Sequence, residues 1–204
     1  MEIVLLRHGM PKINKGRWLS AAEFGLWISE YNAAGIDLGC MPPNDLISRA
    51  GQCSFVVCSH LPRSLESAKV LKVDNVDICE PLFRELEMPH GNRRFPQLPA
   101  SVWLVAFRLL WAAGYTGKVE PFREAKARAH RCAERLAEFA SEHGAVLFVG
   151  HGSLNWFIGK YLKSMGWSGP SRSARRYWDY GVYCYKATEQ LAAKRKKSAP
   201  AEKW

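Results

Sequence analysis

Three short, continuously apolar runs constrain the fold of this chain more than any other feature. They span Glu2–Arg7 (EIVLLR), Phe55–Ser59 (FVVCS) and Ala145–Gly150 (AVLFVG). Apolar runs of this length without alternation are typical of strands that are buried on both faces, as in a parallel sheet covered by helices. Two further segments, Val76–Cys79 and Tyr177–Tyr185, are predicted as the remaining strands.

Helical periodicity dominates the segments between these strands. Ser20 is a candidate N-cap, Pro62 suits a first helical turn, and Gly144 is a natural helix stop. Helices are therefore expected over residues 20–32, 62–71, 101–113, 121–143 and 154–165, and residues 35–44 are expected to form a loop. Strands that alternate with helices predict an α/β fold: a three-layer sandwich with a mostly parallel sheet and helices on both faces.

The 204 residues suit one domain, which is predicted over residues 1–190. Residues 88–120, which begin PHGNRRFPQLP, are expected to form an insertion over one end of the sheet. Residues 191–204 form a basic tail that is predicted to be disordered. The chain has 29 Lys and Arg against 19 Asp and Glu, a balance that favours anionic partners. Nucleic-acid or lipid binding through the tail is the less favoured alternative.

Cysteine spacing and hydropathy indicate the cellular compartment in which the protein is expected to fold. The six cysteines include no CxxC pair or zinc-like spacing, and no leader-like segment precedes the first apolar run. No apolar run reaches the roughly 18 residues of a membrane span. The sequence therefore predicts a cytoplasmic protein with free thiols and no membrane partner.

Three segments with candidate catalytic or binding residues follow the predicted strands. They are Arg7-His8-Gly9, Arg63 in the segment after Ser59, and His151-Gly152. In an open α/β sheet the carboxyl ends of the strands form the ligand site, so these segments are expected to meet. Arginine holds phosphate oxygens in a planar fork, a helix N-terminus adds N–H donors, and a neutral histidine can be a nucleophile. A phosphate pocket is predicted.

In these segments the sequence resembles the histidine phosphatase superfamily, the phosphoglycerate mutase-like group. The resemblance covers residues 1 to about 165 and rests on four patterns in family order. The patterns are Arg-His-Gly after the first strand, S-x-L-x-R-[AS]-x-x-[TS]-A, a Glu after a short strand, and His-Gly after an apolar strand. They are met here by Arg7-His8-Gly9; by Ser59, Leu61, Arg63, Ser64, Ser67 and Ala68; by Glu85 in Phe83-Arg84-Glu85; and by His151-Gly152.

The resemblance implies a role for each site residue. His8 would attack phosphorus and become a phosphohistidine, and Glu85 would protonate the leaving oxygen and later activate water. Arg7, Arg63 and His151 would hold the phosphate oxygens and take part in catalysis. Gly9, Gly152 and Asn14 are expected to line the phosphate site. Neither a metal nor a cofactor is expected.

Several positions depart from the family pattern. Pro11 stands where relatives often have Ser or Thr, and Trp156 stands where they often have Arg. Pro89 replaces a common glycine after the acid, so Glu87 is the alternative to Glu85. Asn14 matches the family, although a loop-capping role explains it equally well.

The function implied is a cofactor-independent phosphatase that hydrolyses a small-molecule or protein phosphomonoester. The alternatives are a phosphoglycerate mutase-type phosphotransferase and a weakly active regulator that binds phosphorylated ligands. Substrate choice is expected to depend on residues 88–120, where His90, Arg93 and Arg94 could contact a second anionic group. The sequence names neither the substrate nor the oligomeric state.

Overall fold

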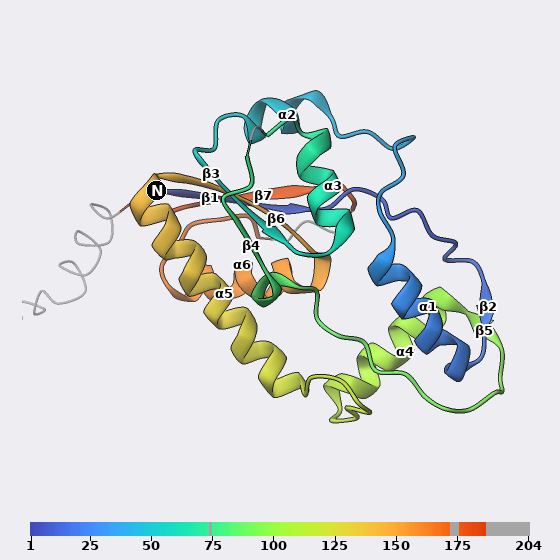
Figure 1. Ribbon diagram of the computed structural model, residues 1–204. Helices are drawn as coiled ribbons and strands as arrows, with labels where there is room; N and C mark the ends of the chain where they lie inside the picture. The colour runs from blue at the N-terminus through green and yellow to red at the C-terminus, as the bar shows by residue number, and fades with distance from the viewer. Residues whose placement is uncertain (74, 172–175, 187–204) are drawn as a thin grey trace, which may run out of the picture.

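A five-stranded sheet forms the centre of the computed structural model, which describes residues 1–73, 75–171 and 176–186 (Figure 1). The predicted tail at 191–204 lies outside these residues. The strand order is β4-β3-β6-β1-β7. Four strands are parallel, and the last, β7, runs antiparallel to β1. The strand bounds are β1 Glu2–Arg7, β3 Phe55–Ser59, β4 Ile78–Glu80, β6 Ala145–Gly150 and β7 Tyr180–Cys184.

Helices cover both faces of this sheet, as the continuous apolar strands predicted. Figure 1 shows α2 (Asn44–Ala50) and α3 (Pro62–Val70) on one face, and α5 (Phe122–His143) and α6 (Gly152–Ser164) on the other. Along β1, the Val4 side chain belongs to the core layer under α2 and α3. The Ile3 and Leu5 side chains belong to the core layer under α5 and α6. Because successive strand residues point to opposite faces, both layers draw on the same strands. The three-layer sandwich is confirmed.

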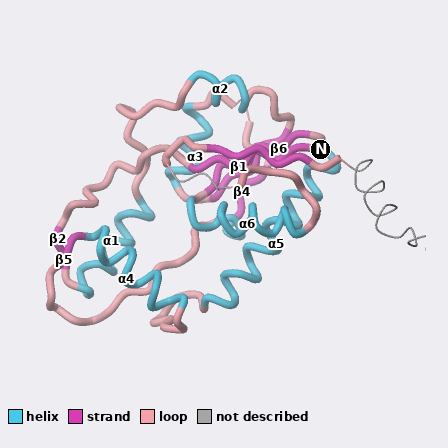
Figure 2. Tube along the Cα trace, turned by 180° about the vertical axis from the view of Figure 1, so that it is seen from behind, coloured by secondary structure: helices cyan, strands magenta, loops and turns pink. Residues whose placement is uncertain are grey.

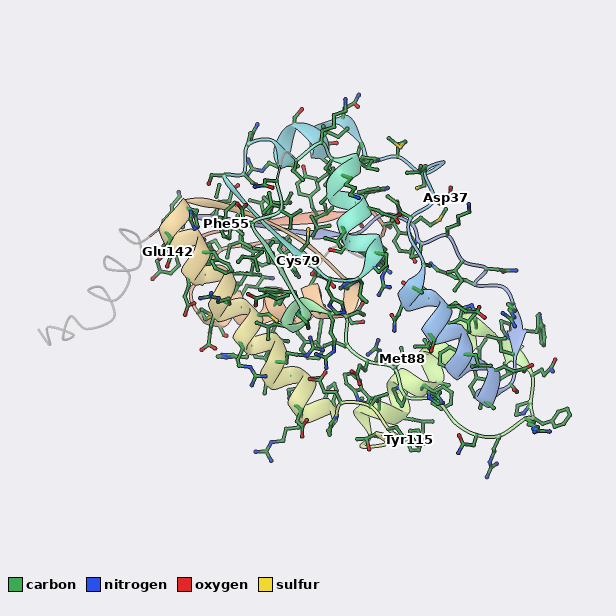
Figure 3. The ribbon with its side chains drawn as sticks, viewed as in Figure 1. Asp37, Phe55, Cys79, Met88, Tyr115 and Glu142 are labelled. Carbon is green, nitrogen blue, oxygen red and sulfur yellow. The ribbon has the colours of Figure 1, made fainter. Side chains whose placement is uncertain are left out.

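A second group of elements lies beside the sandwich, where Figure 2 shows it from behind. It contains α1 (Ala21–Ala33), α4 (Ala100–Ala112) and a two-stranded ribbon of β2 (Trp18–Leu19) with β5 (Leu98–Pro99). This second group has an apolar cluster of its own, in which Phe24 stacks on Trp27 and on Phe107. Residues 88–120 thus pack against the segment 18–33 rather than forming a unit of their own. In Figure 3 Met88 marks the connection between the two groups.

Local sequence signals explain most helix ends. Ser20 and Glu23 form a reciprocal capping box at the start of α1, and Pro62 occupies the first turn of α3. Gly144 follows α5 with a φ of 83°, a conformation that suits glycine. Among the described residues, no helix combines the length and apolar content that crossing a membrane requires.

Three local expectations differ from the structure. The helix α2 and the ribbon β2–β5 were not expected, because both are short and carry little periodicity of their own. The last strand starts at Tyr180 rather than Tyr177. Trp178 adopts a φ of 65°, and its N–H donates to the carbonyl of Arg7. This turn removes residues 177–179 from the strand and directs them toward the carboxyl end of β1.

Candidate active site

The pairing of β1 with β6 brings two histidines together. Arg7 lies opposite Gly150 in the parallel register, so His8 and His151 follow directly from paired positions. The His8 N–H donates to the Gly150 carbonyl at 3.0 Å, and the two imidazole centroids are 5.1 Å apart. Both rings are buried at the carboxyl edge of the sheet. This confirms that the strand ends meet.

Hydrogen bonds fix the tautomer of His8. Its Nδ1 lies 2.7 Å from the Gly9 carbonyl, which can only accept, so Nδ1 carries the hydrogen. Arg63 donates Nε–H to Nε2 of His8 at 3.2 Å, which requires a lone pair on Nε2. Burial, with the positive charges of Arg63, Arg7 and Lys15, holds the pKa of His8 well below its ordinary value. His8 is therefore neutral at neutral pH, with Nε2 unprotonated.

Arg63 is held in place from α1. Its guanidinium donates to the Tyr31 carbonyl at 3.0 Å and to the Asn32 side-chain oxygen at 3.4 Å, and it lies 4.6 Å from the Tyr31 ring centroid. The side chain is fully buried, which lowers its pKa, but an arginine remains charged. The helix α1, from the second group of elements, thus orients the guanidinium of Arg63, which belongs to the sandwich.

His151 occupies the N-cap position of α6, where helix N–H groups point outward. It is fully buried, and neither ring nitrogen has a hydrogen-bond partner among the residues that the structure describes. Burial, then the neighbouring His8 and Arg63, lower its pKa. Buried polar atoms of this kind are rare in proteins, and a bound ligand commonly satisfies them. An oxyanion held at this strand edge could accept a hydrogen bond from the His151 ring.

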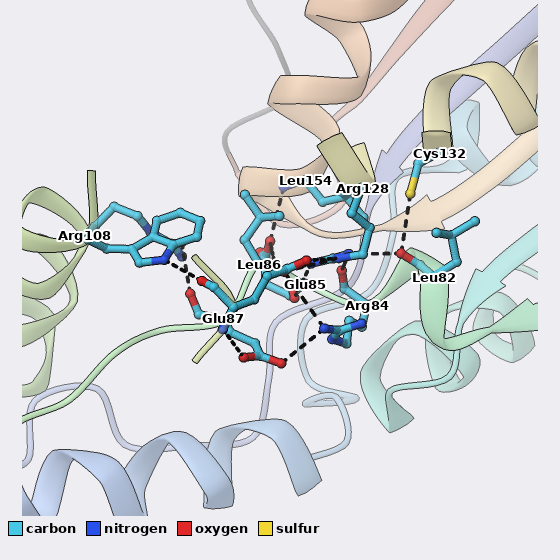
Figure 4. Close-up of polar contacts among 11 residues, drawn as sticks. Leu82, Arg84, Glu85, Leu86, Glu87, Arg108, Arg128, Cys132 and Leu154 are labelled. Atoms are coloured by element: carbon cyan, nitrogen blue, oxygen red, sulfur yellow. Dashed lines mark hydrogen bonds and ion pairs between the residues drawn. The ribbon is translucent and has the colours of Figure 1, made fainter. Parts of the chain in front are cut away.

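Glu85 faces the same edge from the loop after β4. Its Oε1 accepts N–H bonds from Leu86 at 2.9 Å and from Leu154 at 3.1 Å, and its Oε2 accepts from Ser153 at 3.4 Å (Figure 4). The first turn of α6 therefore orients the carboxylate. Glu85 and Arg7 both line a cavity of about 390 Å³ that opens over the strand ends.

Close packing explains why glycine occupies positions 9 and 152. A Cβ on Gly9 would lie 2.4 Å from the Trp178 ring, and a Cβ on Gly152 would lie 3.1 Å from the Arg7 guanidinium carbon. Gly152 thus allows Arg7 to approach the N-terminus of α6. The Gly9 N–H donates to the Ser67 hydroxyl at 2.9 Å, so Gly9 acts on the site through the carbonyl that binds His8.

With this geometry established, comparison with known proteins identifies the family. The family model described as histidine phosphatase superfamily (branch 1) matches residues 46–194, more than half of the chain. The chain belongs to the histidine phosphatase superfamily. The match begins beyond Arg7-His8-Gly9, so the assignment of that triplet rests on the resemblance and on the contacts described above.

Solved structures agree on the fold of this chain. A Mycobacterium tuberculosis open reading frame product is similar with a TM-score of 0.55 and 18% identity, over 91% of this chain and 92% of the other. A mycobacterial glucosyl-3-phosphoglycerate phosphatase complexed with VO3 has a TM-score of 0.53 and 18% identity, over 83% and 94%. A phosphoserine phosphatase mutant from Entamoeba histolytica, complexed with phosphoserine, has a TM-score of 0.53 and 10% identity, over 91% of both chains. No curated protein sequence matched.

Not every residue expected at the candidate site lies there. Asn14 is exposed, and its side-chain oxygen accepts the Gly16 N–H at 2.9 Å. It has the loop-capping role that was the alternative to phosphate binding. His90 packs against Gly25 on α1, and Arg93 and Arg94 are exposed and do not line the 390 Å³ cavity. The structure does not bring these residues to the strand ends.

The two candidate acids lie in different surroundings. Glu87 is held by Arg84 at 3.2 Å and accepts the Glu120 N–H at 2.8 Å (Figure 4). Its carboxylate therefore takes part in a network within the protein, whereas the partners of Glu85 lie at the mouth of α6. Both carboxylates line the 390 Å³ cavity with Arg7, but of the two only Glu85 also lines a second, larger cavity with Arg7. This arrangement favours Glu85 as the acid.

Three cleft residues were missed by sequence reasoning. Lys15 contacts the Tyr177 hydroxyl, and the Tyr177 ring lies 4.4 Å from the Arg7 guanidinium and 5.7 Å from the His8 ring. Arg108 comes from α4 and lines the same cavity as Lys15 and Tyr177. None follows the carboxyl end of a predicted strand, so no pattern marked them. For Arg108 the one available signal was a charge inside an apolar helix.

A buried arginine braces the loop of Glu85. Arg128 on α5 donates Nη1–H to the Leu82 and Arg84 carbonyls, both at 2.9 Å, and forms a salt bridge with Glu120 at 2.8 Å (Figure 4). Its side chain is only 4% exposed. Arg128 therefore positions the segment that carries Glu85, without contact to the cavity.

Proposed function

We propose that this protein hydrolyses phosphomonoesters through a phosphohistidine formed on His8. The observation that carries the proposal is the state of His8: a neutral imidazole whose Nδ1–H is bound to Gly9 and whose Nε2 lone pair faces Arg63. A nucleophilic histidine needs this state, and its cationic surroundings suit a phosphate. The family supports phosphatase or mutase-type activity in general; the intermediate and the residue roles belong to the proposal.

In the first step Nε2 of His8 attacks phosphorus while the bond to the leaving oxygen breaks. The bound phosphate takes over the Arg63 N–H that Nε2 accepts in the free protein. Arg7, Arg63 and His151 hold the equatorial oxygens and stabilise their charge. The leaving oxygen receives the electron pair of the broken bond and a proton from Glu85.

In the second step Glu85 takes a proton from water, whose oxygen attacks phosphorus as the bond to Nε2 breaks. Inorganic phosphate leaves, and His8 returns to its neutral form. The two arginines supply the positive charge that phosphoryl transfer needs, and His151 adds a hydrogen-bond donor, so the proposal requires no metal ion.

The acceptor of the second step separates a phosphatase from a mutase. Solved neighbours are named as phosphatases for glucosyl-3-phosphoglycerate and for phosphoserine. This likeness supports water as the acceptor and a small phosphorylated molecule as the substrate. A mutase-type phosphotransferase would retain the product alcohol and return the phosphoryl group to it. The cytoplasmic location stays a prediction.

The deciding experiment measures phosphate release in EDTA from p-nitrophenyl phosphate and a panel of phosphorylated metabolites. Wild type is compared with His8→Ala and with His130→Ala, a partly buried histidine on α5 that lines neither cavity and serves as the control. We expect release by wild type and the control, and a loss of about a thousandfold or more in His8→Ala. Rapid quenching in alkali should trap an acid-labile phosphoenzyme in wild type and in His130→Ala, but not in His8→Ala. Full activity of His8→Ala would refute the proposal.

A further inference from the structure

We propose that the leaving alcohol of the natural substrate carries a large apolar body. The inference rests on the proposed function and concerns a second cavity of about 570 Å³ beside the reaction centre. This volume lies in the range of pockets that enclose whole small-molecule ligands. The cavity meets the smaller, charged one at Arg7, Glu85, Leu86, Arg108 and Ser153, which line both.

Aromatic rings form a continuous wall of this larger cavity, here called the aromatic chamber. Phe122 is packed edge-on against Trp111 with centroids 4.9 Å apart and lies 6.1 Å from Phe157, which in turn contacts Trp156 at 4.6 Å. The Trp111 N–H donates to the Glu120 carbonyl at 2.8 Å, so its polar group is already satisfied. Such rings offer dispersion contacts and little hydrogen bonding.

Charge is confined to one end of the aromatic chamber. Of the described residues that line it, only Arg7, Glu85 and Arg108 are ionisable, and these are shared with the charged cavity. The other side chains that line it are apolar, apart from the Ser153 hydroxyl and the indole N–H groups of Trp111 and Trp156. A sugar or amino-acid body placed there would lose more hydrogen bonds to water than these groups can replace, which costs free energy. An apolar body would gain free energy from the same burial.

The positions of His8, Glu85 and the aromatic chamber determine how a substrate would be oriented in the cleft. The phosphoryl group belongs beside His8 and Arg7, and the scissile oxygen must lie within reach of Glu85. Glu85 and Leu86 both line the aromatic chamber, so a group bonded to that oxygen can extend into it. A phosphomonoester of a long-chain or ring-bearing alcohol matches this sequence of phosphate pocket, acid and apolar wall.

The charged cavity favours a different occupant. It contains Lys15, His60, Arg84 and Glu87, and its volume is about 390 Å³. A leaving group with its own charges, such as an amino acid or a sugar acid, would fit there instead. The two cavities therefore make opposite predictions for the polarity of the preferred substrate.

A series of n-alkyl monophosphates distinguishes an apolar from a charged leaving group. Ethyl, butyl, hexyl and octyl phosphate differ in apolar length but have nearly the same leaving-group basicity. We expect kcat/KM to rise by about fourfold for each methylene buried, and then to level off once the aromatic chamber is filled. Glycerol phosphate and phosphoserine are the polar comparisons, and both should be poorer than hexyl phosphate.

Trp156→Ala tests the wall itself, with Trp18→Ala as a matched control. Both tryptophans are exposed, at 49% and 64%, but Trp18 lies on β2 away from the aromatic chamber. The ratio of kcat/KM for hexyl over ethyl phosphate should fall by about fivefold or more in Trp156→Ala and keep its wild-type value in Trp18→Ala. Equal rates for ethyl and hexyl phosphate, or a preference for phosphoserine, would overturn the inference and leave the phosphatase intact. No release from any ester would refute the proposed function itself.

Discussion

Arg63 donates a hydrogen bond to the neutral Nε2 of His8 at 3.2 Å, with both side chains almost completely buried. A guanidinium in this position opposes protonation of the imidazole, and it is already placed to bind a phosphate oxygen. One contact thus prepares both the nucleophile and its electrostatic surroundings. Its consequences can be measured through pH dependence, through the acid and through stability.

The acid limb of activity should reflect His8. Burial and the charges of Arg63, Arg7 and Lys15 lower its pKa, so protonation removes the nucleophile only well below pH 6.5. Removing a cation favours the protonated imidazole and raises this pKa. In Lys15→Met the acid limb of kcat/KM should therefore move to higher pH. Lys12→Met, an exposed site in the same loop, is the control. A shift to lower pH would contradict the assignment.

Stability should fall on acidification because two buried histidines resist protonation. The pKa values of His8 and His151 are lowered in the folded protein, so below about pH 6.5 the unfolded chain binds protons that the folded chain does not. The free energy of unfolding then drops as pH falls, by up to about 1.4 kcal/mol per pH unit for each histidine. Urea unfolding without phosphate should show a shallower slope in His151→Gln. An unchanged slope would show that His151 titrates normally.

Glu85→Gln should slow esters in proportion to how poor the leaving group is. Alkyl phosphates need protonation of the leaving oxygen, whereas p-nitrophenyl phosphate does not. We expect a loss of about a hundredfold or more for alkyl phosphates and a smaller loss for p-nitrophenyl phosphate. Glu87→Gln is the matched control, because its carboxylate is held by Arg84 and by the Glu120 N–H. If the leaving-group dependence appeared in Glu87→Gln instead, Glu87 would be the acid.

Arg128→Ala should cost about 3–5 kcal/mol of unfolding free energy, because it leaves Glu120 and two loop carbonyls without their buried partner. Arg135→Ala removes a similar ion pair, with Glu138, from the exposed face of the same helix, and should cost less than about 1 kcal/mol. Urea unfolding of both variants provides the comparison. Equal effects would mean that the Arg128 network is no more than a surface ion pair.

The sequence determined the sandwich because its signals are local. Each continuous apolar run such as Ala145–Gly150 needs two covered faces, and helical periodicity supplied the covers. Sequence motifs also placed Arg7, His8, Arg63, Glu85 and His151, since a strand end fixes where the next residues lie. Signals of this kind depend only on neighbours in the chain.

The surroundings of those residues depend on tertiary packing, which the sequence motifs do not encode locally. Lys15, Tyr177 and Arg108 reach the cleft through the packing of distant segments, and no strand end or spacing announces that packing. Asn14 matched a family pattern but caps its own loop, because a short Asx contact forms locally whatever the motif suggests. The aromatic chamber joins α4, α5 and α6, so its apolar character emerges only when the three helices meet.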